Sequence, residues 1–202
     1  MLIRHGDVDG GHHVLWGRRD VALTAEGRRQ VHALKPALAA LQVSRLVTSP
    51  CRRASESAAL LADALALIPA LDAGFDEFDY GDWAGRTFGE LGRDRRWLSF
   101  NRERRDRSAA PGGETVLDFR VRVRLALDDL LGQAHGVTCV VTHAEVVRTI
   151  VLDALGLQPG AWSGVTIPPA SVTLLRGSSR PVRVLGVGLA ATDTAALMRA
   201  AF

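Results

Sequence analysis

Three short polar clusters in this sequence combine histidine, arginine and serine, which are residue types suited to phosphoryl transfer. The clusters are Arg4-His5, Ser49 to Arg53, and Thr142-His143. A neutral imidazole can attack phosphorus, and arginine forks bind the non-bridging oxygens of a phosphoryl group. Zinc sites prefer cysteine or carboxylate partners, which these clusters do not supply in a ligand spacing. The sequence therefore predicts a phosphoryl site that uses no metal and no cofactor.

Taken singly, each of these residues has a simpler interpretation. A histidine that follows a strand is commonly a loop residue making a backbone hydrogen bond, and an arginine in a first helical turn is commonly solvated. The functional interpretation depends on convergence. Ligands of parallel α/β sheets bind beyond the carboxyl ends of the strands, and all three clusters follow predicted strands. We therefore expect them to meet in one crevice.

Hydrophobic spacing predicts alternating strands and helices. Thr24 is a good N-cap for a helix with Pro36 as a kink, and Ser49-Pro50 would cap and open the next helix. Val116 to Leu130 and Glu145 to Leu155 have helical periodicity, with Gly156 as the C-cap of the latter. The predicted strands are Met1–Ile3, Arg45–Thr48, Val137–Thr142, Ser171–Leu175 and Val182–Val187.

This alternation predicts an α/β fold, a three-layer α/β/α sandwich with a mostly parallel central sheet. The length suits one domain over residues 1–202. Residues 87–113 are expected to insert a small, mobile helical cap. That segment is rich in arginine, and we leave open whether its arginines face the site or only solvent: Arg93, Arg95, Arg96, Arg102, Arg104, Arg105 and Arg107.

Composition excludes several other classes of protein. The net charge is only +3 and aromatic residues make up 5% of the chain, without a recognition motif, so no nucleic-acid partner is expected. Cys51 and Cys139 are too few for a disulfide framework and are predicted to be reduced thiols. No apolar run reaches the length of a membrane span. We expect a cytoplasmic protein whose partner is a small phosphorylated molecule, and the sequence leaves a homodimer open.

Several motifs occur together and in order. Arg4-His5-Gly6 is followed by Gly17, Asp20, Leu23, Thr24 and Gly27, which match the pattern G-x-x-D-x-x-L-T-x-x-G. Ser49 to Ala54 matches S-P-x-x-R-A, and Glu77 to Gly85 matches E-x-x-x-G-x-W-x-G. Pro111 to Glu114 and Val141 to His143 complete the set. Over roughly residues 1–175 the chain resembles the histidine phosphatase superfamily, in the branch that includes cofactor-dependent phosphoglycerate mutases.

The resemblance implies a role for each matched residue. His5 would attack phosphorus and form a phosphohistidine, while Arg4, Arg53 and His143 would hold the phosphoryl oxygens. Glu77 would protonate the leaving oxygen and later deprotonate the attacking water. Further contacts to the substrate are expected from Gly6, Gly17, Arg18, Arg86 and Ala144. The neighbouring Asp76 and Asp79 are expected to raise the pKa of Glu77.

The chain also departs from the pattern of this family. Only three residues precede Arg4, where relatives usually have a longer strand. Val8 stands where a hydroxyl is common, and Gly11 near a frequent asparagine, so one phosphate contact is expected to be missing. His12 or His13 would replace it or remain exposed. Ala144 replaces a glycine, and Glu145 adds a carboxylate.

The predicted function is hydrolysis of a small phosphate monoester. The segment Asp76 to Arg86, with Pro111 to Glu114, looks most similar to alpha-ribazole phosphatases and their broad-specificity relatives, so alpha-ribazole phosphate or a sugar or glycerate phosphate would be the substrate. Two alternatives remain. A phosphoglycerate mutase would carry a long insertion that this chain lacks, and a non-catalytic binding relative would be expected to have lost part of the catalytic set.

Overall fold

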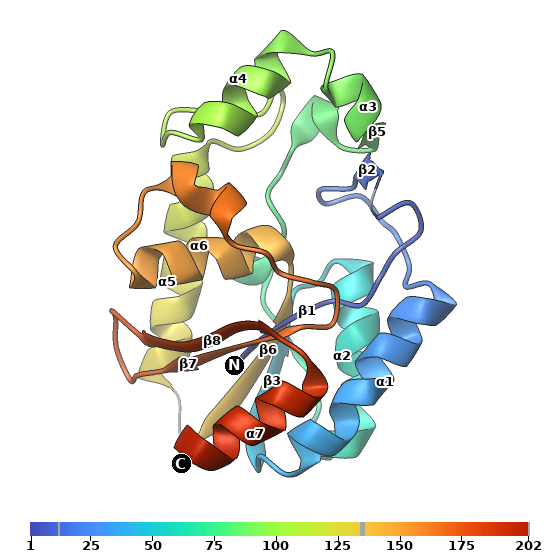
Figure 1. Ribbon diagram of the computed structural model, residues 1–202, viewed down its shortest axis with the longest axis vertical. Coiled ribbons are helices and arrows are strands. Elements are labelled where there is room, and N and C mark those ends of the chain that lie inside the picture. Colours follow the sequence, from blue (N-terminus) through green and yellow to red (C-terminus); the bar gives the residue numbers. More distant parts are fainter. Residues whose placement is uncertain (12, 134–135, 202) are drawn as a thin grey trace.

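A six-stranded sheet forms the centre of the molecule (Figure 1). The computed structural model describes residues 1–11, 13–133 and 136–201. In spatial order the strands are β4 (Ala70–Leu71), β3 (Val43–Thr48), β6 (Val137–Thr142), β1 (Leu2–Arg4), β7 (Val172–Arg176) and β8 (Arg183–Leu189). The first four run parallel, whereas β7 and β8 are antiparallel to their neighbours. The predicted mostly parallel sheet is confirmed.

Helices cover both faces of this sheet. On one face α1 (Ala25–Ala39), α2 (Arg52–Leu65) and α7 (Ala191–Ala201) pack against strand residues such as Ile3 and Val141. On the other face α5 (Val116–Gly132) and α6 (Ala144–Ala154) pack against Leu2 and Val140. Alternate residues of β1 and β6 thus face opposite layers, as pleated strands require. The three-layer α/β/α prediction is confirmed.

The helix boundaries follow the predicted capping residues with one exception. The Thr24 hydroxyl accepts a hydrogen bond from the backbone N–H of Gly27 (2.9 Å), and Pro36 lies inside α1. Gly156 has a positive φ of 67° just beyond α6, as its predicted C-cap role requires. The exception is α2, whose N-cap is Cys51 and not Ser49. Ser49 is occupied by other partners, which are described below.

The upper part of Figure 1 consists of short elements above the sheet. Helices α3 (Phe88–Leu91) and α4 (Arg95–Glu103) fall within the segment expected to form a cap. A second, two-stranded sheet precedes them, in which β2 (Val14–Leu15) pairs antiparallel with β5 (Arg86–Thr87). Three 3₁₀ turns complete the fold: η1 (Ala73–Phe75), η2 (Gly81–Trp83) and η3 (Pro159–Gly164).

An aromatic cluster anchors these upper elements. Trp83, Trp97 and Phe100 are buried against Tyr80, with ring centroids 5.2 to 6.5 Å apart. Such tilted and edge-on ring pairs contribute stabilisation beyond the area they bury. In the part of the chain that the structure describes, we find no helix with the length and apolar character needed to cross a membrane.

Candidate active site

The three polar clusters meet at the carboxyl ends of neighbouring strands. The backbone N–H of His5 donates to the carbonyl of Thr142 (2.9 Å), and that of Ser49 donates to the carbonyl of Val141 (3.0 Å). Strands β3, β6 and β1 are adjacent and parallel, so the residues that follow them share one edge of the sheet. Two helices, α2 and α6, also begin at this edge and direct their N-termini toward it.

His5 is held as a neutral ring whose single lone pair is directed at Arg53. Its Nδ1 lies 2.7 Å from the Gly6 carbonyl oxygen. Because a carbonyl only accepts, Nδ1 carries the proton and Nε2 carries the lone pair. Arg53 donates from Nε to this Nε2 at 3.0 Å. Burial, followed by the charges of Arg53 and Arg4, holds the pKa of His5 well below its ordinary value. The ring is therefore neutral, and a neutral imidazole has the lone pair that nucleophilic attack requires.

Gly6 serves packing at this position. A Cβ on Gly6 would lie 2.3 Å from the carbonyl oxygen of Gly27, and one on Gly27 would lie 2.1 Å from that of Asp7. The His5 loop therefore presses directly on the first turn of α1, which explains both glycines. Gly6 is outside the lining of the cavity, and its carbonyl orients His5 instead of contacting a substrate.

Two arginines lie beside His5, Arg53 with its side chain buried and Arg4 with its side chain partly buried. Arg53 extends from the first turn of α2, and its two terminal nitrogens donate to the carbonyls of Arg19 (3.2 Å) and Gly17 (2.5 Å). Arg4 donates to the carbonyl of Ile167 at 2.6 Å, and its Nε has no hydrogen-bond partner among the described residues. Fixed donors of this kind can bind a phosphoryl oxygen without reorganising.

His143 lies on the other side of His5, with the ring centroids 5.2 Å apart. Its Nε2 is 2.8 Å from the Ser49 hydroxyl, which in turn donates to Asp76 at 2.5 Å. Ser49 also accepts from the backbone N–H of Cys51 (3.1 Å). These bonds explain why Ser49 does not cap α2: its hydroxyl joins three segments of the site.

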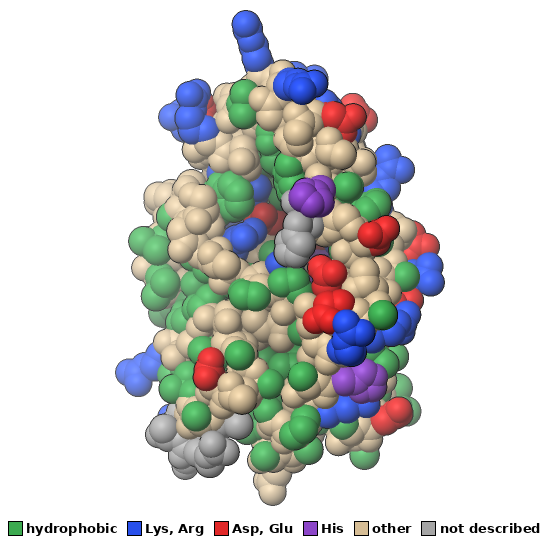
Figure 2. Space-filling view, turned by 45° about the vertical axis from the view of Figure 1, so that its right-hand side comes forward, with side chains coloured by type: hydrophobic (Ala, Val, Ile, Leu, Met, Phe, Trp, Pro, Cys, Tyr) green, Lys and Arg blue, Asp and Glu red, His purple; other side chains and the backbone are tan. Residues whose placement is uncertain are grey.

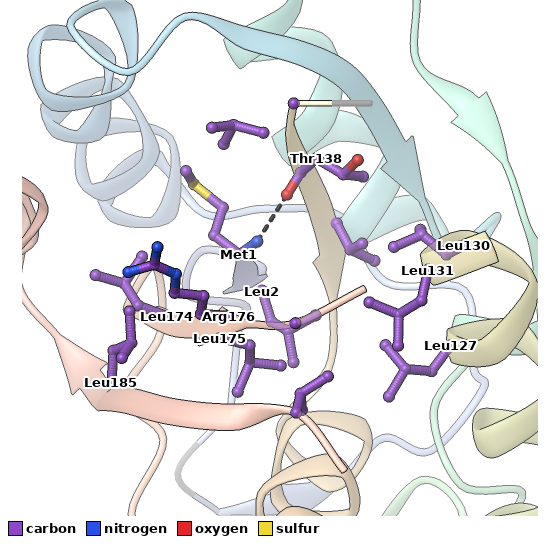
Figure 3. Close-up of a pocket in the computed structure, with 15 residues that line it drawn as sticks. Met1, Leu2, Leu127, Leu130, Leu131, Thr138, Leu174, Leu175, Arg176 and Leu185 are labelled. Atoms are coloured by element: carbon purple, nitrogen blue, oxygen red, sulfur yellow. Dashed lines mark hydrogen bonds between the residues drawn. The ribbon is translucent and has the colours of Figure 1, made fainter. Parts of the chain in front are cut away.

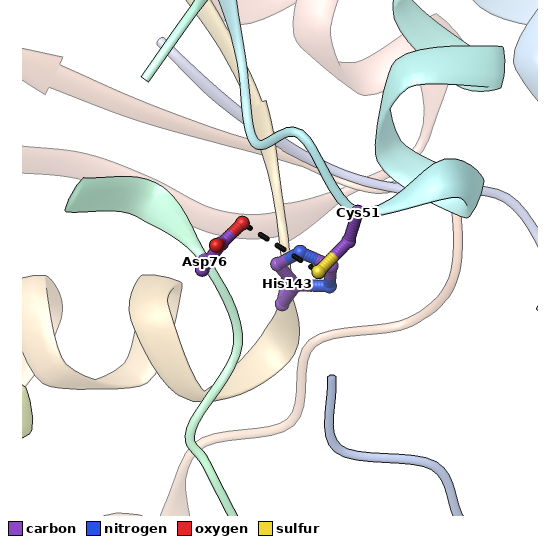
Figure 4. Close-up of side chains that lie close together, drawn as sticks. All are labelled: Cys51, Asp76 and His143. Atoms are coloured by element: carbon purple, nitrogen blue, oxygen red, sulfur yellow. Dashed lines mark hydrogen bonds between the residues drawn. The ribbon is translucent and has the colours of Figure 1, made fainter. Parts of the chain in front are cut away.

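Cys51, Asp76 and His143 together resemble a metal-ligand set (Figure 4). Their ligand atoms lie within 4.8 Å of one another, and the Cys51 thiol is 3.5 Å from Asp76 Oδ1. Because the Ser49 hydroxyl already bridges Asp76 and His143, an ion bound there would have to replace these hydrogen bonds. Hydrogen bonds through Ser49 therefore already join Asp76 and His143 without an ion.

Glu77 lies in the same crevice and has the protonation behaviour of a general acid. Its Oε1 accepts from the backbone N–H of Phe78 (3.0 Å). Burial, and then the charge of Glu145, raise the pKa of Glu77 to about 7, although Arg53 and Arg4 oppose the shift. A carboxyl with this pKa can donate a proton near neutrality and take one back.

The charged neighbour of Glu77 is therefore Glu145, not Asp76 or Asp79 as expected. Asp76 is bonded to Ser49, and Asp79 accepts from the backbone N–H of Gly81 (3.0 Å) and lies 3.8 Å from Arg18. Sequence proximity misled here because side chains of adjacent residues diverge in an extended loop. Glu145 is 68 residues away in the chain and reaches the site from the first turn of α6.

Glu145 belongs to a buried ion-pair cluster that the sequence did not reveal. It accepts from Arg104 and from Arg148, each at 3.0 Å. Burial opposes ionisation of Glu145, yet Arg104 and Arg148 hold its pKa below its ordinary value. The Arg104 guanidinium lies 4.1 Å from the ring centroid of Trp162 and donates to the Tyr80 hydroxyl (3.1 Å). Glu145 thus stays ionised while Glu77 takes the proton.

One of the seven arginines of the cap faces the site, and the other six face solvent. Arg104 is 5% exposed and lines the cavity. The other six are exposed: Arg93, Arg95, Arg96, Arg102, Arg105 and Arg107. Only the residue that ends α4 in a left-handed conformation turns its side chain inward.

A cavity of about 350 Å³ lies between the sheet edge and the upper elements, and its lining includes Glu77, Arg104 and Glu145. Figure 2 shows the molecule hollowed there, with basic and acidic side chains in the recess. Its floor holds Arg4, His5, Arg53 and Glu77, and aromatic side chains contribute to its walls: Trp16, Tyr80, Phe88, Trp97 and Trp162. His143 is fully buried beside His5 and is not among the described residues that line the cavity. Polar groups converging within aromatic walls are typical of small-molecule sites.

A second cavity, of about 410 Å³, lies at the opposite end of the strands and is almost entirely apolar (Figure 3). Leucines such as Leu127 and Leu174 line it, and the Met1 amino group donates to the carbonyl of Thr138 (2.7 Å). Among its described lining residues there is no histidine or carboxylate. Its size alone does not make it the reactive site.

The remaining predicted substrate contacts divide into two groups. Gly17, with a φ of 54°, and Ala144 line the cavity, as do Val8 and Gly11. Arg18 and Arg86 are not among the described residues that line it. His13 is exposed, and His12 lies outside the described residues.

Arg18 and Arg86 have structural partners. Arg86 pairs with Asp94 (2.9 Å). Arg18 donates to the Glu77 carbonyl and to the Glu114 carboxylate, both at 2.9 Å. Arg122 donates to the same Glu114 oxygen (2.9 Å). These contacts fix the backbone that carries Glu77. They also give Glu114, which follows Pro111-Gly112-Gly113, a structural role as the shared partner of two arginines. The sequence motif did not indicate this role.

Comparisons with known proteins agree with this geometry. Residues 1–189 match the model of the histidine phosphatase superfamily (branch 1). A bifunctional protein of Mycobacterium tuberculosis is 33% identical over 183 residues, which are 86% of this chain and 49% of that protein. The chain thus spans about half the length of the first curated relatives it matches.

Two phosphatases are similar over most of both chains. Glucosyl-3-phosphoglycerate phosphatase of Mycobacterium tuberculosis is 30% identical over 195 residues, covering 90% of this chain and 86% of that protein. A solved structure of the mycobacterial enzyme has a TM-score of 0.82 at 26% identity, covering 94% and 98%. A putative alpha-ribazole-5'-P phosphatase of Escherichia coli has a TM-score of 0.81 at 21% identity, covering 94% and 96%, which shows the shared fold. This chain belongs to the histidine phosphatase superfamily, branch 1.

Proposed function

We propose that this chain is a phosphatase that hydrolyses a small-molecule phosphate monoester through a phosphohistidine on His5. One observation carries the proposal: the Nε2 lone pair of a buried, neutral His5 accepts from Arg53 in a cavity that also holds Arg4 and Glu77, and the pKa of Glu77 is raised to about 7. Nucleophile, charge stabilisation and proton donor are then within one site.

In the first step the phosphoryl oxygens bind Arg4, Arg53 and His143. His5 Nε2 forms a bond to phosphorus as the bond between phosphorus and the ester oxygen breaks. Glu77 gives its proton to that oxygen, and the alcohol leaves. The Gly6 carbonyl, 2.7 Å from Nδ1, stabilises the positive charge that the ring acquires.

In the second step water attacks the phosphohistidine. The Glu77 carboxylate takes a proton from the water while the bond between His5 and phosphorus breaks, which releases inorganic phosphate and restores both residues. Arginine forks balance the charge of the phosphoryl group throughout. We therefore expect that turnover needs no metal ion and that a chelator leaves it unchanged.

The proposed substrate class is a phosphate ester with a ring-bearing alcohol, such as alpha-ribazole phosphate or a sugar phosphate, ahead of a glycerate phosphate. Five aromatic side chains among the described residues of the cavity wall support a ring as the leaving group. Glu145 offsets part of the charge of Arg104 and Arg148, which makes the upper cavity less suited to a second strong anion. Two phosphatases named for substrates that carry a ring, glucosyl-3-phosphoglycerate and alpha-ribazole-5'-P, share the fold.

The wider setting is also a proposal. We propose one histidine phosphatase domain over residues 1–202, with residues 87–113 as a cap that controls access to the cavity. A cytoplasmic location and the absence of a nucleic-acid partner stay predictions, as does the homodimer.

The test is a panel of alpha-ribazole phosphate, sugar phosphates and 3-phosphoglycerate, assayed with and without chelator. Acid-labile label from a phosphorylated substrate should be trapped on wild-type protein and absent from His5→Ala, whose circular dichroism should match the wild type. Full activity in His5→Ala, or a strict need for magnesium or zinc, would overturn the proposal.

A further inference from the structure

One serine oxygen receives hydrogen-bonding partners from three separate segments of the site. Ser49 Oγ lies 2.5 Å from Asp76 Oδ1, 2.8 Å from His143 Nε2 and 3.1 Å from the backbone nitrogen of Cys51. Ser49 follows β3, Asp76 follows η1 and His143 follows β6. Asp76, Ser49 and His143 therefore form a continuous chain, which we call the Asp-Ser-His relay (Figure 4 shows its two ends).

The proton positions in this relay follow from the chemistry of its members. An ionised carboxylate only accepts, so the single hydroxyl proton of Ser49 points to Asp76. The Ser49 oxygen must then accept from both the Cys51 N–H and His143 Nε2. His143 therefore carries its proton on Nε2. Its Nδ1 is buried, and no described residue hydrogen-bonds to it.

The charges around His143 oppose one another. Burial, and then the charges of Arg53, His5, Arg4 and Arg122, hold its pKa well below its ordinary value, so the ring is neutral when no anion is bound. On the other side lie the Asp76 carboxylate, through Ser49, and the Cys51 thiol, which is 3.5 Å from that carboxylate. A bound phosphoryl group offsets the arginine charges and leaves Asp76 as the partner of the ring.

We propose that Asp76 is a positioning residue for phosphoryl transfer: through Ser49 it fixes the Nε2–H tautomer of His143 and stabilises the imidazolium that forms when a phosphoryl group binds. The added proton is the one that a phosphate monoanion carries, and it moves to Nδ1. The ring then donates from Nδ1 to a phosphoryl oxygen and from Nε2 to Ser49. This inference rests on the proposed function, because it assigns a partner to the same phosphoryl site.

Nitrogen-15 NMR of labelled histidines tests the tautomer and the charge directly, because imidazole shifts distinguish Nδ1–H, Nε2–H and cationic rings. The His143 signals are assigned by their loss in His143→Asn. Wild type should show the Nε2–H form alone and the cation with orthovanadate. In Asp76→Asn, which keeps an acceptor but loses the charge, the pKa of the loaded ring should fall by about 1–3 pH units.

Two matched variants accompany this measurement. Asp79→Asn removes a carboxylate from the same loop without touching Ser49, and it should behave as wild type. Ser49→Ala should lose both the tautomer preference and the cation. An Nδ1–H ring in wild type, or an Asp76→Asn protein that matches Asp79→Asn in both states, would overturn the inference.

Rate measurements separate positioning from proton donation. Asp76→Asn should lower kcat about tenfold or more for alkyl and aryl esters alike, since each pH unit of lost charge stabilisation corresponds to a factor of about ten. A loss confined to alkyl esters would make Asp76 the general acid and contradict the relay. Stoichiometric Zn²⁺ binding that is abolished in Cys51→Ala would instead make the cluster a metal site, and would also contradict it.

Failure of the proposed function would look different. A wild-type protein that turns over no phosphate ester and traps no phosphohistidine would refute the phosphatase. Normal turnover with an unaltered His143 in Asp76→Asn would refute the relay alone.

Discussion

Arg53 Nε lies 3.0 Å from His5 Nε2, so the guanidinium group points at the lone pair of the proposed nucleophile. Arg53 is also bonded to the carbonyls of Gly17 and Arg19, which fix its orientation. Together with burial, the charge of this side chain holds the pKa of His5 well below its ordinary value, and its guanidinium group lies where a phosphoryl group would approach Nε2.

Replacing the guanidinium group of Arg53 by a single ammonium group should lower the rate of catalysis. Arg53→Lys should lower kcat by about 10²- to 10³-fold, the usual cost of losing one aligned donor to transition-state charge. The matched control is Arg52→Lys, because Arg52 is half-exposed and pairs with Glu56 (2.8 Å) outside the cavity. Steady-state rates of both variants check this, and equal effects would remove Arg53 from the phosphoryl site.

The proposed role of Glu77 predicts a dependence on the leaving group. Glu77→Gln should slow phosphorylation by an alkyl phosphate by about 10²- to 10⁴-fold, and much less by p-nitrophenyl phosphate, whose leaving group departs without a proton. Single-turnover rates are needed, because Glu77 would also act as base in the second step and slow both substrates at steady state. An unchanged alkyl rate would direct attention to Glu145, the other carboxylate among the described residues that line the cavity.

The raised pKa of Glu77 also predicts how stability depends on pH. Since the pKa is about 7 in the folded protein and ordinarily 4.5, the folded state binds more protons between these values. Stability contributed by this group is therefore present below pH 4.5 and is lost as pH rises through 7. Urea unfolding at pH 5 and pH 8 should show that Glu77→Gln removes on the order of 1–3 kcal/mol of this decline. An identical decline in both proteins would contradict the buried, protonated carboxyl.

Glu145 should set the pH range in which Glu77 works. Its charge raises the pKa of Glu77, so Glu145→Gln should move the alkaline limb of kcat toward lower pH. The same change leaves Arg104 and Arg148 without their shared carboxylate, which also favours ionised Glu77. Breaking such a buried pair should destabilise the fold by about 3–5 kcal/mol, so the profile is to be measured at low temperature. A limb that stays in place or moves to higher pH would refute this coupling.

The arginines near the cavity should differ in their effect on substrate binding. Arg148 lines the cavity, so Arg148→Gln should raise KM for 3-phosphoglycerate by about tenfold relative to an aryl phosphate, as expected for a lost charged hydrogen bond. Arg102 is exposed on α4, and Arg102→Gln should leave both KM values within about twofold. If both variants shift KM equally, the net charge of the protein, and not a contact from Arg148 in the cavity, determines substrate binding.

Local sequence determined the elements and the reactive residue types. Thr24, Gly156 and the β-prone run Val137–Thr142 act within a few residues, so capping and strand boundaries could be predicted. The convergence of His5, Arg53 and His143 also followed, because parallel strands place their carboxyl ends at one edge.

Contacts between distant segments were decided only by the tertiary structure. Ser49 looked like a helix cap, but folding brings Asp76 and His143 to its hydroxyl, and these partners from distant segments replace the cap. Arg18 and Arg86 looked like substrate ligands, yet each is held by a carboxylate from another loop. Electrostatic environment depends on burial and on charges from remote segments. No local pattern could therefore show that Glu145, and not Asp76 or Asp79, tunes Glu77.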